Sequence, residues 1–506
     1  MGPVEEILSL AKRSGVALWT EAEQLRFRAP AGAMTAELRT ALSTRKTDII
    51  AALGRPVLVR KPLSQRLPII EYHRSRWDNI RSGFLGIEFV NSPHAAVSIP
   101  GELIVSALRR ALCIVAARHP ILRARVVETV DGLEFALSPE DDIPLEVIDL
   151  SNEAVAQRQA VARIVVTERI WRPFEADARH WLRLFAVRLG ETEHVVGFVI
   201  HHFIADAGSV GIFLQELLHA YAAFASGVAP GLPDLPCQYF DYISGMNQWI
   251  RSAAARISGS YWREYLRNAP ATRIPPDFEV DPEALGLLAT QSARTSAEAV
   301  VDVQSFCRSS GMTLHAVVAA AFIGVMAHQS KAQDIVLVTR THGRTDPALL
   351  PMIGAFFDAM ALRAFVTLEM SFHALATRVW NDLTRASLHQ NYPYHLVVPA
   401  LAEIGASNIA PMMNFLDQPA AKATAAAGHV QSFELAPRPP IQHPAKRYGG
   451  FYTQIAARTD GIYCKAEYMD IMYREATVTN FVQAICRLLE RGARDPARSL
   501  SDLLAD

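Results

Sequence analysis

The strongest chemical feature of this sequence is a pair of histidines, His201 and His202, that ends a run of apolar residues. Asp206 follows after three intervening residues, and the small residues Ala207 and Gly208 come next. Histidine is the side chain whose ordinary pKa suits proton transfer near neutral pH. A pair of histidines alone is most often a packed or a surface feature. This spacing, after a strand pattern and before a helix pattern, instead predicts a general base. We expect the catalytic residues to be His202, His201, Asp206 and Gly208.

The residues around the histidines suggest supporting roles. Asp206 comes four residues after His202 and cannot face it on the same helix, so we expect it to turn inward and hold the loop. Ala207 and Gly208 allow the backbone to approach a substrate closely, and a backbone N–H near Gly208 can stabilise an oxyanion. No third ligand follows at a recognisable spacing, so the sequence predicts no metal site.

The elements that must position this segment can be read from the pattern of apolar residues. Leu182–Arg188 and His194–Ile200 have the pattern of buried strands, and Ser209–Ala225 has helical spacing. Val105–Arg118 predicts another helix, and Ile335–Arg340 predicts another buried strand. This mixture of helix and strand patterns along the chain predicts a mixed α/β (α+β) fold.

Composition and charge exclude several classes of protein. The chain has 506 residues, half of them hydrophobic, and a formal net charge of −1. This length predicts more than one domain, and the neutral balance gives no electrostatic reason to expect nucleic-acid or membrane binding. The five scattered cysteines form no CxxC pair and predict neither a zinc site nor disulfides. Together with the lack of a signal-peptide pattern, they predict a cytoplasmic protein.

Three units are expected along the chain. Residues 1–58 are expected to fold as a small module of helix, β-hairpin and helices, followed by a basic linker that contains prolines. Residues 66–240 are expected to form a first lobe that carries the histidine pair, and residues 241–506 a second lobe.

The small module has the features of a binding unit. The expected strand at its centre offers an edge to which a partner strand can add, and nearby basic residues can attract an acidic tail. The alternative is a stabilising N-terminal cap with solvated charges. The candidate docking residues are Leu25, Arg26, Phe27, Arg28, Arg45 and Lys46.

The HHxxxD pattern resembles the signature of the condensation domains of nonribosomal peptide synthetases and of their acyltransferase relatives. The resemblance covers residues 66–506, and six further segments resemble motifs of that family in the correct order. They are Arg118–Arg123, Trp171–Glu175, Tyr261–Trp262, Gly343–Arg344, Ile353–Phe356 and His389–Gln390.

This resemblance implies a fold and a set of roles. The family fold is two chloramphenicol-acetyltransferase-like lobes in a V, with the active site between them. His202 matches the catalytic second histidine, and Asp206 matches an aspartate that pairs with the arginine matched by Arg344. The donor is an acyl group on the phosphopantetheine arm of a carrier protein, and no cofactor is bound.

The sequence also departs from the family pattern. Ala207 stands where the motif has glycine, and Asp358–Ala359 stands where asparagine and threonine are usual. An early SxAQxRLW motif is not recognisable around Leu67–Asp78. These departures favour a specialised member over one that joins amino acids.

The N-terminal module resembles the TubC-type docking domains, which bind the C-terminal tail of an upstream synthase. This resemblance implies an acyl or peptidyl carrier protein as partner, and we expect the chain to meet that carrier in trans. The whole chain, with its docking module, is similar in organisation to the chain-releasing enzymes of hybrid polyketide–peptide assembly lines.

The resulting hypothesis is an acyltransferase that moves an acyl chain, of polyketide type, from a carrier thioester to the hydroxyl or amine of a small-molecule acceptor and releases an ester. Three alternatives stay open: amide formation with a carrier-bound amino acid, an acyl-CoA-dependent O-acyltransferase, and a catalytically silent recruitment scaffold. The presence of His201, His202 and Asp206 argues against the scaffold.

Overall fold

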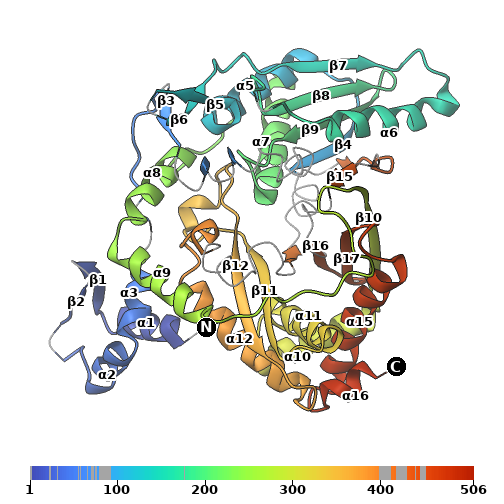
Figure 1. The fold of residues 1–506 in the computed structure, drawn as a ribbon. Helices are drawn as coiled ribbons and strands as arrows, with labels where there is room; N and C mark the ends of the chain where they lie inside the picture. The colour runs from blue at the N-terminus through green and yellow to red at the C-terminus, as the bar shows by residue number, and fades with distance from the viewer. Residues whose placement is uncertain are drawn as a thin grey trace.

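A computed structural model gives the architecture of the chain as two lobes and a small N-terminal module (Figure 1). Its mixture of sheets and helices confirms the predicted α/β class. The structure describes residues 3–21, 24–30, 32–54, 56, 58–64, 66–69, 73–74, 77–78, 93–130, 132–175, 177–397, 412–416, 430–438, 440, 442–444 and 452–505.

The N-terminal module is a two-stranded hairpin packed on three short helices. Its elements are α1 (Pro3–Arg13), β1 (Ala17–Glu21), β2 (Gln24–Arg28), α2 (Ala36–Thr44) and α3 (Lys46–Leu53). Apolar residues at helical spacing, among them Val4, Ala11, Leu38, Leu42 and Ile49, form its core. The predicted order of helix, hairpin and helices is confirmed.

The first lobe is built on a five-stranded sheet of order β14-β4-β9-β8-β7. Helices α5 and α7 pack against each other beside it, and a three-stranded sheet of order β3-β6-β5 lies next to them (Figure 1). The elements that precede α8 are β3 (Arg66–Pro68), β4 (His94–Pro100), α5 (Val105–Arg118), β5 (Ala124–Thr129), β6 (Gly132–Leu137), β7 (Leu145–Asp149), α6 (Val155–Trp171), β8 (Leu182–Arg188), β9 (Glu193–Ile200) and α7 (Ala207–Ala225).

The second lobe is built on a seven-stranded sheet of order β12-β11-β13-β16-β17-β10-β15, with helices α10, α11, α12 and α15 against it. Helix α11 is apolar on all sides because it is buried on all sides. The elements are β10 (Leu285–Arg294), α10 (Ala297–Ser310), α11 (Leu314–Ser330), β11 (Asp334–Thr341), β12 (Asp358–Phe365), α12 (Phe372–Ser387), β13 (Met412–Leu416), β14 (Gln431–Ser432), β15 (Gln442–Pro444), β16 (Tyr452–Arg458), β17 (Gly461–Met469), α15 (Glu475–Arg494) and α16 (Leu500–Leu504).

The two lobes exchange segments, so the packing boundary differs from the expected boundary at residues 240 and 241. Helix α8 (Tyr239–Trp249) buries its apolar residues in the core of the first lobe. Helix α9 (Ala253–Tyr265) begins in that core and ends in the core of the second lobe. In addition, Ile353 and Phe356 pack in the first lobe, and β14 pairs with β4. Tertiary packing therefore moves the junction into α9.

The N-terminal module is fixed to the body of the protein. Helix α3 packs against α9, the indole of Trp249 donates a hydrogen bond to the carbonyl of Gly54, and Leu388 packs against the module core. The expected linker is bound as well, since the Lys61 backbone N–H donates to Asp241 (2.9 Å).

Across the described residues, no single helix is long and apolar enough to cross a membrane; the bent pair of α10 and α11 meets that criterion by length and composition alone.

Candidate active site

His202 lies directly after β9, and its ring is held in a defined tautomer. Its Nδ1 lies 2.8 Å from the carbonyl oxygen of Ala205. A carbonyl can only accept, so Nδ1 carries the hydrogen and donates it, which leaves the lone pair on Nε2. The ring also packs on Phe357, with 4.3 Å between ring centres. In its neutral form this half-buried imidazole therefore offers on Nε2 the lone pair that a general base needs.

His201 points the opposite way, into the core of the first lobe. It is buried, stacks on Trp181 with ring centres 4.8 Å apart, and meets the edge of Phe174. Its Nδ1 accepts a hydrogen bond from the backbone N–H of Phe203 (3.1 Å). Both histidines follow Ile200, the last residue of β9, and the turn that includes His202 sends its ring away from the core that encloses His201. His201 is therefore a packing residue, and its assignment as catalytic needs correction.

Asp206 caps helix α7 and pairs with Arg344 of the other lobe. Its Oδ1 accepts from the Ser209 backbone N–H (2.8 Å), the Ser209 hydroxyl (2.7 Å) and the Arg344 guanidinium (2.8 Å). The two charged side chains are only 6% and 8% exposed. Asp206 thus turns inward, as its place in the sequence predicts, and acts on the loop rather than on a substrate.

Arg344 is held on several sides at once. Its guanidinium donates to the carbonyls of Leu349 (2.5 Å) and Met352 (2.6 Å) and lies 4.4 Å over the ring of Phe356. Gly343 makes the turn before it with a φ of +65°, where a side chain would collide with the Phe356 carbonyl. Arg344 is therefore a buried ion-pair partner of Asp206 and not a surface arginine in a turn.

Because Gly208 has no side chain, the Arg344 guanidinium can pack closely against it. A Cβ at residue 208 would lie 3.2 Å from the Arg344 Nε. The expectation that this glycine lets a substrate approach needs correction, because the guanidinium fills that side. Its backbone N–H lies in the first turn of α7, where helical N–H groups have no acceptor within the helix.

Residues of two other motifs stabilise the elements that surround this site. His119 and Arg118 both bond Glu216 of α7, at 2.9 Å and 3.0 Å. Burial raises the pKa of Glu216, but the hydrogen bonds and charges of His119 and Arg118 outweigh it and hold that pKa below its usual value. His119 also accepts from the Ile353 backbone N–H at 3.4 Å. These contacts tie α5, α7 and the segment that carries Arg344 together.

A family model of the condensation domain matches residues 91–505 of the chain. The chain belongs to the condensation domain family. A model of the TubC N-terminal docking domain matches residues 4–54, so both resemblances predicted from the motifs are confirmed. Condensation domains of nonribosomal peptide synthetases are acyltransferases that form amide or ester bonds, which confirms the predicted enzyme class at the level of the family.

The curated relatives of this condensation domain are large synthetases. It is 28% identical over 418 residues to one of the linear gramicidin synthase proteins of Brevibacillus parabrevis, covering 81% of the chain and 8% of that protein. It is 25% identical to enniatin synthase of Fusarium equiseti, covering 81% of the chain and 13% of that protein. The chain therefore spans a small part of the length of these relatives.

Solved structures share the fold along nearly the whole chain. The condensation domain for chain release from the enacyloxin polyketide synthase superposes with a TM-score of 0.68 at 18% identity, covering 97% of each chain. The EpoB cyclization-docking bidomain from Sorangium cellulosum superposes with a TM-score of 0.72 at 21% identity, covering 98% of this chain and 99% of that one. The predicted chloramphenicol-acetyltransferase-like fold is confirmed.

The docking residues of the condensation domain's N-terminal module do not all lie at its surface. Arg26, Phe27 and Arg28 of β2 are exposed, with Phe27 at 52%. Leu25 is half-buried and packs against the module core.

Two further basic docking candidates lie beside the hairpin, where α2 ends and α3 begins. Arg45 is half-buried and lies 3.3 Å from Asp48, whereas Lys46 is exposed. The exposed basic candidates are therefore Arg26, Arg28 and Lys46.

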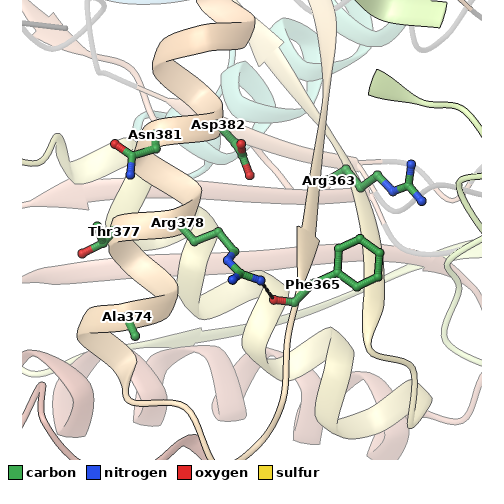
Figure 2. A pocket seen from close by; sticks show the side chains of 7 residues that line it. All are labelled: Arg363, Phe365, Ala374, Thr377, Arg378, Asn381 and Asp382. Atoms are coloured by element: carbon green, nitrogen blue, oxygen red, sulfur yellow. Dashed lines mark hydrogen bonds between the residues drawn. The ribbon is translucent and has the colours of Figure 1, made fainter. Parts of the chain in front are cut away.

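A surface hollow of about 610 Å³ lies between β12 and α12 of the second lobe (Figure 2). Arg378 on α12 crosses its floor and donates a hydrogen bond to the carbonyl of Phe365. Phe365 ends β12, whereas Phe357, the residue that contacts His202, comes just before that strand begins. At roughly 3.3 Å per residue, Phe365 lies about 26 Å along the chain from Phe357, so the hollow is toward the other end of β12 from the candidate base. Within the described ranges, no cluster of three potential metal ligands occurs.

Three residues of the site were not found from the sequence. The Ala205 carbonyl orients His202, Ser209 bridges Asp206 to Gly354 (3.1 Å), and Phe357 supports the imidazole. Ser209 had a usable signal, because Asp-x-x-Ser before an apolar helix is a capping pattern. Ala205 and Phe357 had none, since a backbone carbonyl and one phenylalanine among many carry no distinctive spacing.

Proposed function

We propose that this chain transfers an acyl group from the phosphopantetheine thioester of a carrier protein to the hydroxyl or amine of an acceptor. The observation that carries the proposal is the geometry of His202. Its Nδ1–H is committed to the Ala205 carbonyl, so Nε2 has the lone pair that takes a proton. Membership of the condensation domain family supplies the reaction type.

The chemistry needs one proton transfer and good alignment. The acceptor oxygen or nitrogen attacks the thioester carbonyl carbon while its proton moves to Nε2 of His202. A C–O or C–N bond forms, the C–S bond breaks, and the proton passes to the departing sulfur to give the free thiol. Since a thioester is already activated, alignment and proton management supply the main acceleration. The backbone N–H of Gly208 is our candidate donor to the oxyanion.

Asp206 and Arg344 are positioning residues in this proposal. They fix the start of α7 and join the two lobes beside His202 without touching the reacting atoms. His201 has no chemical role, because its ring is enclosed by Trp181 and Phe174.

We further propose that the acyl chain is of polyketide type and leaves as an ester. The support is the similarity, over 97% of both chains, to a condensation domain that releases the enacyloxin polyketide. The donor would be an acyl or peptidyl carrier protein whose C-terminal tail binds the N-terminal module, and the match to the TubC docking domain supports this role. In this arrangement the acidic tail adds along β2 and meets Arg26, Arg28 and Lys46.

The test is a direct assay of acyl transfer. Acyl-loaded carrier protein is incubated with the chain and a panel of alcohols and amines, and products are read by mass spectrometry. His202→Ala should lower turnover by roughly 10²–10⁴-fold, the usual contribution of a general base. His219→Ala, an exposed histidine on α7, is the matched control and should keep full turnover. Near-normal turnover of His202→Ala would contradict the base role.

A further inference from the structure

The guanidinium of Arg340 lies close to His202 and makes no hydrogen bond or ion pair with the described residues. Arg340 is half-buried near the end of β11, and its guanidinium carbon lies 5.4 Å over the ring of Phe357. The same ring packs on His202 at 4.3 Å. The two distances, 5.4 Å and 4.3 Å, add to an upper limit of 9.7 Å between the Arg340 guanidinium carbon and the centre of the His202 ring.

The strand register places these groups on one face of the second-lobe sheet. Arg340 is paired with Ala359 across β11 and β12. Phe357 comes two residues before Ala359, so its side chain leaves the sheet on the same face as Arg340. This is the face that meets His202 of the first lobe.

Other arginines in this part of the fold have their charges compensated, and Arg340 does not. Arg344 pairs with Asp206 (2.8 Å), and Arg363 pairs with Asp334 (2.7 Å). Within the part of the chain that the structure describes, Arg340 makes no hydrogen bond and no ion pair. A half-buried guanidinium loses hydration and gains by meeting an anion, for which its planar set of N–H donors is well suited.

Asp358, the carboxylate next to it in the fold, does not fill this role. Its two oxygens accept from the backbone N–H groups of Ala359 (2.8 Å) and Tyr394 (3.1 Å). The carboxylate is thereby used to anchor the start of a helical turn at residue 394. No hydrogen bond or ion pair joins Asp358 to Arg340, so the guanidinium of Arg340 is available to a substrate anion.

We propose that Arg340 recognises a free carboxylate on the acceptor, which makes the acceptor a small hydroxy or amino acid that is not attached to a carrier. This inference rests on the proposed function and names its acceptor class. The nucleophile must reach His202 while the anion reaches Arg340, so only a few carbon atoms separate the two groups.

Other anions of the reaction do not fit this position. The carboxyl of a carrier-bound amino acid is consumed in its thioester and carries no charge. The phosphate of the pantetheine arm lies at the far end of the arm from the sulfur that must reach His202. A free acid is the remaining anion that is short enough.

The experiment compares acids with their uncharged esters. Octanoyl-loaded acyl carrier protein is the donor, and 3-hydroxybutanoate, 4-hydroxybutanoate and the methyl ester of each are the acceptors. The wild-type chain should use an acid about 10- to 100-fold better in kcat/KM than its ester, the range of one or two charge-assisted hydrogen bonds. Arg340→Met should remove this preference and leave the ester rate unchanged. Arg340→Lys should restore part of the preference.

Arg458→Met is the matched control, since Arg458 is an exposed arginine of the same sheet that stacks on Tyr463. It should leave the preference intact. Equal use of acid and ester by the wild type, or equal losses with both in Arg340→Met, would overturn the proposal, the second by showing that Arg340 only supports Phe357.

Failure of the proposed function would look different, with no acceptor of any kind acylated. Carboxylate recognition is then decided by thermal unfolding in 3-hydroxybutanoate, which should raise the Tm of the wild type more than that of Arg340→Met. The same rise in both proteins would overturn the role of Arg340.

Discussion

Replacement of Asp206 by alanine tests whether the ion pair between the lobes is a buried structural unit. The substitution leaves the Arg344 guanidinium, which is 8% exposed, without its counter-charge. It also removes the side-chain cap of α7, because Ser209 loses the acceptor of its backbone N–H. Breaking a buried pair from one side costs about 3–5 kcal/mol, and loss of the cap accounts for about 1 kcal/mol of this total. This is a large fraction of the stability of an ordinary domain.

Two companion variants separate charge from packing. Asp206→Asn keeps an oxygen that accepts from Ser209 and Arg344 but removes the charge, so its cost should be smaller, about 1 kcal/mol. In the double variant Asp206→Ala with Arg344→Met, the stranded charge is gone, and the loss should be less than the sum of the two single losses. The measurement is urea unfolding followed by circular dichroism.

The control is an ion pair of similar geometry at the surface. Asp302 and Arg494 lie 3.3 Å apart but are 37% and 67% exposed. Asp302→Ala should therefore cost less than about 1 kcal/mol. An unchanged unfolding midpoint in Asp206→Ala, or a double variant whose loss equals the sum, would refute the reasoning about the buried pair. Neither result would bear on the base role of His202.

Three further outcomes are expected. Burial lowers the pKa of His389 from 6.5 to about 4, so the unfolded chain takes up a proton first and stability should fall between about pH 6.5 and pH 4. The fall in the free energy of unfolding should be about 3 kcal/mol, and His389→Gln should flatten it in unfolding experiments. Gly343→Ala should lower the Tm far more than Gly311→Ala, because both glycines have positive φ but only residue 343 also lacks space for a Cβ. Arg26→Glu combined with Arg28→Glu should slow transfer from a carrier that bears its synthase tail, more so at low salt, and should not slow transfer from the same carrier without the tail.

The last test uses substitutions because the N-terminal module contributes to the body of the protein. Deleting residues 1–60 would remove α3 from α9 and leave the Trp249 indole without the Gly54 carbonyl. A loss of activity after deletion would then mix lost packing with lost recruitment. Both the docking role and the role of a stabilising cap are compatible with this interface, and the charge-reversal variants distinguish them.

Local patterns were enough to predict most elements near the site. The helix expected at Val105–Arg118 and the strand expected at Leu182–Arg188 have those same bounds in the structure. The periodicity of apolar residues reports which face is buried, and that face is set by neighbours along the chain. Helix α7 begins at Ala207 rather than at the expected Ser209. Asp206 is its N-cap, and the small residues Ala207 and Gly208 belong to its first turn.

Contacts between distant residues were not predictable in the same way. The packing of α8 with the first lobe, the addition of β14 to β4 and the contact of Phe357 with His202 each join segments far apart in the sequence. Nothing in the local pattern of either partner specifies the other. The surroundings of Arg340 belong to this class, and so does the match between α3 and α9.

The sequence by itself determined the chemistry that this chain can offer, because the identity and spacing of His202, Asp206 and the other motif residues are properties of the chain and mark its family. Only the tertiary structure decided which of them are buried and which stay partly exposed. After β9 the fold buries His201 in the core and leaves His202 half-buried against Phe357, and it turns Asp206 to Arg344 across about 140 residues. Side-chain direction and burial are set by contacts that form when both lobes pack together. The local spacing of residues does not specify those contacts.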